Sequence, residues 1–132
     1  MKSVWSESCK FRKREALNKD IKTDVLVIGA GIAGILTAYI LKQKGREVVL
    51  IDAAEIASGN TKNTTAKITS QHDLIYSKLI TEFGEEKARQ YAKANELAIK
   101  KYKEIIEDKR IECDFEEKPA YVYSLNEVDV LK

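Results

Sequence analysis

Several residue types that often define a protein class are scarce in this sequence. Its 132 residues include one proline, one histidine and two cysteines. Cys9 and Cys113 lie far apart without metal-ligand spacing, which indicates free thiols and predicts a cytoplasmic protein without a metal site. The net charge is only +2, from 23 basic and 21 acidic residues. A nucleic-acid-binding protein usually carries a clustered basic excess, so nucleic acid is excluded as an expected partner.

Long apolar runs are also missing. No stretch approaches the roughly 18 apolar residues of a membrane-spanning helix, so we expect no membrane span. Residues 1–14 are polar and basic and lack the apolar core of a secretory signal. The hydrophobic content of 44% is ordinary, and the charged content of 33% is above the usual quarter. The length and composition therefore suit one globular domain with its own core.

A strand–helix–strand pattern occupies residues 24–52. Residues 24–28 form a short run rich in β-branched side chains, which predicts a buried parallel strand. Residues 31–44 carry apolar side chains at helical spacing and are followed by Gly45, a typical helix stop. Residues 48–51 predict a second buried strand. The expected fold class is therefore α/β, with a Rossmann-like βαβ unit and a parallel sheet.

The turn between the first strand and the helix reads Gly29-Ala-Gly31-Ile-Ala-Gly34. Gly29 permits a tight turn, Gly31 lets the backbone approach a pyrophosphate, and Gly34 lets the helix pack closely on the strand. The helix that opens at Ile32 and Ala33 then offers N–H groups to phosphate oxygens. This motif alone is weak, but here it follows a predicted strand and opens a predicted helix, as dinucleotide binding requires.

Asp52 adds an acid at the end of the second strand, eighteen residues beyond Gly34. A carboxylate there can accept hydrogen bonds from both ribose hydroxyls of an adenosine. It would repel a 2′-phosphate, so we expect the site to reject NADP. A glycine-rich turn in an α/β fold without any ligand is the alternative interpretation.

The βαβ unit alone does not choose between FAD and NAD. The segment Asp52-Ala-Ala-Glu-Ile-Ala-Ser58-Gly59-Asn-Thr61-Lys-Asn-Thr64-Thr65-Ala66-Lys67 resembles the flavin-contacting stretch of the D-amino-acid oxidase family, which includes glycine, sarcosine and γ-glutamylputrescine oxidases. The resemblance covers residues 24–70. It implies an FAD-dependent oxidoreductase that takes a hydride from a C–N bond of an amine or amino acid. The chain is also similar to a bacterial branch of oxidoreductases, some of which carry a C-terminal Rieske domain.

The resemblance also implies which residues meet the cofactor. Hydroxyl groups in the loop would donate to pyrophosphate and ribityl oxygens, small residues would allow close backbone approach, and one lysine would neutralise phosphate charge or lie near the electron-rich flavin edge. The predicted cofactor-binding residues are Gly29, Gly31, Ile32, Ala33, Gly34, Asp52, Ala53, Ser58, Gly59, Thr61, Thr64, Thr65, Ala66 and Lys67. Asn63 stands near the position where some relatives attach FAD to histidine, so we expect non-covalent FAD. A polar loop with local hydrogen bonds and a solvated lysine are the alternatives.

The second half of the chain predicts helices and then strands. Residues 73–83 predict a short helix with Asp73 as its N-cap and Gly84 as its stop. Residues 85–109 predict a long amphipathic helix. Residues 113–117 and 120–124 predict two strands around a Lys118-Pro119 turn, and Ser124-x-x-Glu127 resembles a capping box.

The expected organisation is an N-terminal fragment of a larger enzyme. The limits are an irregular lead-in at 1–20, the FAD-binding unit and loop at 21–72, a helical segment at 73–110, and the start of a second β region at 111–132. That region would lead to an absent substrate domain, so we expect the fragment to be inactive, to expose apolar surface and to self-associate as a homodimer. An NAD-binding module without catalysis and an inactive truncated product are the alternatives.

Overall fold

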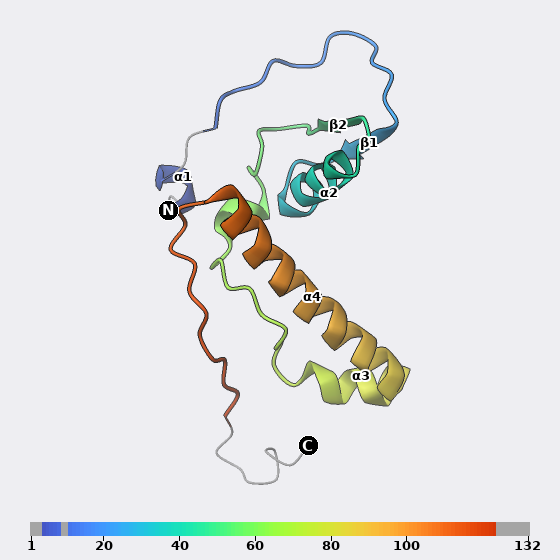
Figure 1. Ribbon diagram of the computed structural model, residues 1–132, viewed down its shortest axis with the longest axis vertical. Coiled ribbons are helices and arrows are strands. Elements are labelled where there is room, and N and C mark those ends of the chain that lie inside the picture. Colours follow the sequence, from blue (N-terminus) through green and yellow to red (C-terminus); the bar gives the residue numbers. More distant parts are fainter. Residues whose placement is uncertain (1–3, 9–10, 124–132) are drawn as a thin grey trace. The chain divides into compact units, whose positions relative to one another are not determined.

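The computed structural model describes residues 4–8 and 11–123, and the chain divides into two compact units between Ala66 and Lys67. Figure 1 labels the elements. In the first unit they are α1 (Val4–Ser8), β1 (Val25–Ile28), α2 (Ile32–Gln43), β2 (Val48–Ile51) and the 3₁₀ turn η1 (Asn60–Asn63). In the second unit they are α3 (Ile75–Phe83) and α4 (Glu85–Lys109).

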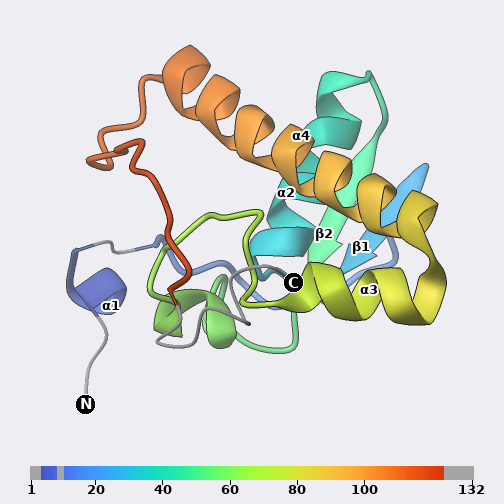
Figure 2. The same ribbon diagram turned by 90° about the horizontal axis from the view of Figure 1, so that it is seen from below.

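The first unit is built on two parallel strands. β1 and β2 pair in register from Val25 with Val48 to Ile28 with Ile51. The pairing continues beyond β1, where the N–H of Gly29 donates to the carbonyl of Ile51 at 2.7 Å. α2 packs on both strands and connects them (Figures 1 and 2). The predicted strand–helix–strand arrangement is therefore confirmed as a small α/β structure.

α2 is held by part of its predicted apolar stripe. Ile35, Leu36, Tyr39 and Ile40 are half-buried, as the helical spacing predicts. Ile32, in the first turn of the helix, remains 46% exposed. At the other end the chain turns through Gly45 at a φ of 76°, which confirms the predicted helix stop.

The glycine turn depends on two missing side chains. Gly29 has a φ of 103°, a conformation that side chains of L-residues rarely adopt. A Cβ on Gly34 would lie 1.8 Å from the carbonyl oxygen of Gly29, which is deep inside van der Waals contact. The first turn of α2 therefore lies directly against the end of β1. Both structural roles predicted for these glycines are confirmed.

Two apolar side chains of β1 are left without a cover from their own unit. Val25 and Val27 are half-buried, whereas Leu26 is 51% exposed and Ile28 is 78% exposed. Strands that are apolar on both faces are typical of parallel sheets covered on both sides. The apolar surface expected from the sequence is therefore present on the described part of β1.

The loop after β2 folds back onto the glycine turn. The N–H of Ala57 donates to the carbonyl of Ala30 at 2.9 Å, and Ala57 adopts a left-handed φ of 58°. Four residues later, the Oγ1 of Thr61 accepts a hydrogen bond from the N–H of Ile32 at 3.0 Å. These two contacts fix the loop at both sides of the turn, and η1 is the short helical turn within it.

The second unit is a pair of helices joined at Gly84. Gly84 has a φ of 82°, and its N–H donates to the carbonyl of Ile80 at 2.9 Å, so α3 ends and α4 begins at the predicted stop (Figure 2). α3 packs on α4. Ala88 is buried, and Ala98 is exposed. The half-buried positions of α4 are Tyr91, Ala92, Asn95, Ile99, Tyr102, Lys103, Ile105 and Ile106.

Aromatic side chains tie the start of the second unit to α4. The hydroxyl of Tyr91 lies 3.0 Å from Nδ1 of His72, and Tyr91 meets the rings of His72 and Tyr76 edge-on, with ring centroids 6.0 Å apart in both pairs. The hydroxyl of Tyr76 donates to the carbonyl of Ser70 at 2.5 Å. His72 therefore lies at the entry to the two helices.

Asp73 does not cap α3, so that prediction was wrong. The helix begins at Ile75, and its N-cap position is Leu74, without a side-chain hydrogen bond. Asp73 has a left-handed φ of 51°, which is outside the extended conformation that an N-cap residue usually takes. The preceding turn, closed by the N–H of Ile75 on the carbonyl of His72, takes the place of a side-chain cap.

The secondary structure near both termini also differs from the predictions. Residues 4–8 form α1, where an irregular segment was expected. Residues 113–117 and 120–123 form no strand, although strands were predicted at 113–117 and 120–124. A strand needs a neighbouring backbone for its hydrogen bonds, and no described segment of this unit pairs with them. Residue 124 and the predicted capping box lie outside the described residues.

A Gly34→Ala substitution tests the close approach of α2 to β1. The added methyl would overlap the Gly29 carbonyl, so we expect the first unit to lose about 1–3 kcal/mol of stability or more. Native-state hydrogen exchange of the β1 and β2 amides would measure the loss. Gly59→Ala is the matched control, because a Cβ there meets no atom within 4 Å. Equal exchange in the two variants would contradict the packing described here.

A Thr61→Val substitution tests how the loop is attached. Valine keeps the shape of threonine but removes the acceptor for the Ile32 N–H, so the loop contact should weaken by about 0.5–1.5 kcal/mol. Faster hydrogen exchange at Ile32 and Ala57 would report this. Thr61→Ser retains the hydroxyl and should exchange like the unmodified chain. The attachment is disproved if the valine and serine variants behave alike.

Candidate functional site

The predicted cofactor residues of the first unit gather where β1 and β2 end. Parallel strands place their carboxyl ends at the same edge of a sheet, and ligands of open α/β sheets bind beyond that edge. Here the glycine turn follows β1 directly, and Asp52 follows β2 directly. The returning loop adds Thr61 to the same edge through its contact with Ile32.

Asp52 is fixed by two backbone amides, one on each carboxylate oxygen. Its Oδ2 accepts from the N–H of Ala30 at 2.6 Å, and its Oδ1 accepts from the N–H of Ala54 at 2.7 Å. Ala30 is buried, with 2% of its surface exposed, whereas Asp52 itself is exposed. The hydrogen bonds from Ala54 and Ala30 lower the pKa of Asp52 below the ordinary aspartate value. The acid is therefore charged and held in one orientation at neutral pH.

The remaining acceptor capacity of Asp52 suits a ribose. An ionised carboxylate has about four acceptor sites on its two oxygens, and two of them are used by Ala30 and Ala54. Each oxygen therefore keeps one acceptor site, and because the side chain is exposed, these sites are open to solvent or a ligand. Two adjacent hydroxyl donors, as on an adenosine ribose, match this arrangement.

The start of α2 suits a phosphate group. The first N–H groups of a helix have no acceptor within the helix, and the first helical bond here runs from Ile35 to Gly31. Thr61 accepts the N–H of Ile32, and the amides of Ala33 and Gly34 belong to the same turn. Gly31 contributes no side chain, and a Cβ there would already come within 3.3 Å of the Thr61 hydroxyl. Glycine at position 31 therefore lets Thr61 approach the start of α2 without a tight contact.

The other predicted hydroxyl residues are not drawn into the turn. Ser58 is half-buried, and its N–H donates to the carbonyl of Glu55. Thr64 accepts the N–H of Ala66 at 3.1 Å, a local turn of the kind that the polar-loop alternative predicts. Thr65 is exposed. Of the four hydroxyl side chains, Thr61 is the one that the structure places against the glycine turn.

The remaining predicted cofactor residues of the loop are three small residues and one lysine. Ala53 and Gly59 are exposed, and Gly59 accepts a hydrogen bond at 3.5 Å from Nδ2 of Asn63. Ala66 has a left-handed φ of 56°. Lys67 is exposed and begins the second unit. The cofactor roles of these residues stay predictions.

Sequence reasoning missed three residues that shape the turn, namely Ala30, Ala54 and Ala57. All three act through backbone groups, so their side chains carried no signal. Ala30 lies inside the glycine motif, and its burial follows from the position between Gly29 and Gly31. The left-handed φ of Ala57 is unusual for alanine and had no sequence cue.

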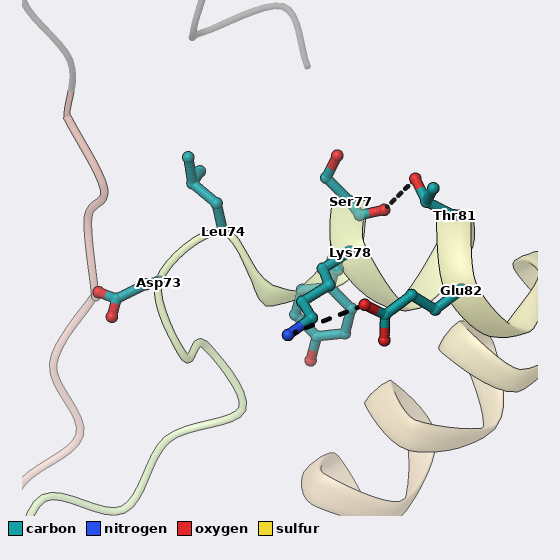
Figure 3. A pocket seen from close by; sticks show the side chains of 7 residues that line it. Asp73, Leu74, Ser77, Lys78, Thr81 and Glu82 are labelled. Atoms are coloured by element: carbon teal, nitrogen blue, oxygen red, sulfur yellow. Dashed lines mark hydrogen bonds and ion pairs between the residues drawn. The ribbon is translucent and has the colours of Figure 1, made fainter.

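A hollow on the second unit does not coincide with the predicted site. Figure 3 shows that it follows the first turns of α3, where Nζ of Lys78 lies 3.8 Å from Oε1 of Glu82 and the Thr81 hydroxyl donates to the Ser77 carbonyl. Its lining also includes Asp73, Leu74 and Tyr76. These are helix-surface contacts between near neighbours, and none of the predicted cofactor residues lines it.

The described residues contain neither a candidate metal site nor a candidate membrane-spanning helix. No group of three or more histidine, cysteine, aspartate or glutamate side chains is arranged to hold a metal ion within residues 4–8 and 11–123. Over the same part of the chain, no helix has the length and apolar character needed to cross a membrane.

Three curated proteins illustrate what the chain is similar to. YhfW of Bacillus subtilis, which is named as a Rieske 2Fe-2S iron-sulfur protein, is 44% identical over 130 residues, which is 98% of this chain and 26% of YhfW. OrdL of Haemophilus influenzae, named as an oxidoreductase, is 30% identical over 79% of the chain and 24% of its own length. Gamma-glutamylputrescine oxidoreductase of Escherichia coli is 24% identical over 80% of the chain and 25% of its own length. The chain thus spans about a quarter of the length of these relatives.

The family assignment comes from a match to a family model. No solved structure matches the chain at a significant level. The model of the FAD-dependent oxidoreductase family termed DAO matches residues 24–132, which include both strands, the glycine turn, Asp52 and the helical pair. The resemblance stated from the sequence is therefore confirmed, and the chain belongs to the DAO family of FAD-dependent oxidoreductases.

Proposed function

We propose that this chain is the N-terminal FAD-binding portion of a larger, Rossmann-like flavin-dependent oxidoreductase. The observation that carries the proposal is the pairing of a side-chain-free helix start with a fixed carboxylate at one sheet edge. Gly31 and Gly34 open the start of α2, and Asp52 offers two remaining acceptor sites beside it. The start of α2 suits a pyrophosphate and the carboxylate suits a ribose, which are neighbouring groups in an adenine dinucleotide.

The residues of this chain would hold the cofactor rather than carry out the reaction. Asp52 would accept from the ribose, and the amides of Ala33 and Gly34 with the hydroxyl of Thr61 would meet the pyrophosphate. When bound, FAD supplies the electron acceptor of the reaction. Ser58, Thr64, Thr65 and Lys67 would extend the contacts toward the flavin, without a covalent link.

An amine or amino acid is the proposed substrate of the complete enzyme. The support is family membership together with the similarity to a gamma-glutamylputrescine oxidoreductase. The Rieske name of the Bacillus relative supports a complete protein with an additional iron-sulfur domain. We also propose a cytoplasmic location, and self-association of the isolated chain through the bare face of Leu26 and Ile28.

The complete protein should contain flavin and lose its colour with an amine. After purification its visible spectrum should show the bands of oxidised flavin, which NAD does not give. Anaerobic mixing with a panel of amines and amino acids should bleach these bands as electrons enter the cofactor. A colourless protein that carries NAD would support the binding-module alternative. Flavin that stays oxidised with every compound of the panel would contradict the amine substrate.

The isolated 132-residue chain should bind FAD weakly and turn over no substrate. It provides the adenosine and pyrophosphate contacts, but much of the apolar burial around a flavin ring would come from the rest of the protein. Titration of FAD into the chain, followed by flavin fluorescence, measures the affinity. The complete protein is the control. Tight stoichiometric binding by the isolated chain would show that its own residues suffice.

A further inference from the structure

The ends of β1 and β2 are fastened by side-chain carboxylates at both edges of the sheet. At the edge where the strands begin, Oδ2 of Asp24 accepts from the N–H of Glu47 at 3.2 Å. At the edge where they end, Asp52 accepts from the N–H of Ala30 at 2.6 Å. Both contacts join an acid on one strand to the backbone beside the other strand. Only the contact at Asp52 reaches the glycine turn.

The Asp52 contact falls at the centre of the turn. Ala30 lies between Gly29, which takes the left-handed φ, and Gly31, which precedes α2. Its N–H points to Asp52, and its carbonyl accepts from the N–H of Ala57, so both of its backbone groups are engaged by the chain after β2. The most buried described residue of the unit is therefore held through its backbone from two sides.

The second amide on Asp52 fixes the plane of the carboxylate. A carboxylate held by a single hydrogen bond can rotate about it. With Oδ2 on Ala30 and Oδ1 on Ala54, rotation would break one bond or the other. The turn and the acid thus hold each other in place without a ligand.

We propose that Asp52 is a positioning residue for the glycine turn, in addition to its ribose role: its carboxylate holds the turn in binding shape through the Ala30 N–H before any cofactor arrives. The ribose role rests on the proposed function, whereas the hold on the turn does not. A preformed turn binds without the cost of ordering a loop. Replacing Asp52 would therefore loosen the glycine turn and also remove a ribose contact.

Asp52→Asn in the ligand-free 132-residue chain is the test. Asparagine has nearly the same size but only one carbonyl oxygen, so it can serve one of the two amides and turns an N–H₂ group toward the other. We expect hydrogen exchange at Ala30 and Gly31 to become about tenfold faster or more, with β1 and β2 protected as before. Asp24→Asn is the matched control, because it removes the same charge at the other edge and should leave Ala30 exchange unchanged. Unchanged exchange at both Ala30 and Ala54 in Asp52→Asn would overturn the proposal.

A titration of the unmodified chain keeps the test valid if Asp52→Asn does not fold. Because the pKa of Asp52 is lowered, the contact should be complete above the ordinary aspartate value of about 3.9 and be lost as pH falls through the lower value. The amide proton shifts of Ala30 and Ala54 should then move together with one midpoint below about 3.9. Independent midpoints, or no movement at Ala30, would overturn the proposal. A purely structural loss of stability would shift amides throughout the unit.

The test of the Asp52 hold on the turn can fail or succeed independently of the test of FAD binding. The exchange and titration measurements use no cofactor. A complete protein without flavin would contradict the FAD proposal and leave the hold of Asp52 on the turn intact. Flavin in the complete protein, together with unaltered exchange at both Ala30 and Ala54 in Asp52→Asn, would confine Asp52 to the ribose role.

Discussion

The approach of α2 to the carbonyl of Gly29 is the constraint on which the rest of the first unit depends. With any side chain at position 34 the helix would have to move away from β1, because a Cβ there would lie 1.8 Å from that oxygen. The close approach sets the sharp turn at Gly29 and aims the start of α2 at the sheet edge. It also brings Ala30 within reach of Asp52. The packing of one glycine thereby determines where both a phosphate and a ribose could bind.

The loop after β2 completes this arrangement with few contacts. It crosses the sheet edge, and the N–H of Ala57 donates to the carbonyl of Ala30. The hydroxyl oxygen of Thr61 accepts the N–H of Ile32 and so caps the start of α2. A capping residue usually precedes its helix directly, but here position 31 must be glycine and has no side chain to offer. A threonine thirty positions along the chain takes over that task. This explains why a loop with little regular structure can still hold a defined site.

Much of this could be predicted from the sequence because the signals were local. The strand bounds, the stops at Gly45 and Gly84, and the helix at 85–109 follow from periodicity and from glycine. The glycine motif and Asp52 likewise sit at a spacing that a βαβ unit imposes. The strands predicted at 113–117 and 120–124 would need a neighbouring strand, and no pattern within these segments can show whether one is present. The N-cap predicted at Asp73 is wrong for a local reason, because the residue has a left-handed φ. The backbone contacts of Ala30, Ala54 and Ala57 lie beyond any reading of side-chain types.

We propose that the edge formed by the glycine turn and Asp52 binds the adenosine end of FAD. A crystal structure of the complete, FAD-loaded protein would show where the adenosine lies. We expect the adenosine ribose within hydrogen-bond distance of the Asp52 carboxylate, the pyrophosphate at the start of α2 beside Thr61, and the bond from Ala30 to Asp52 still in place. An adenosine bound elsewhere, or a ribose that makes no contact with Asp52, would contradict this proposal.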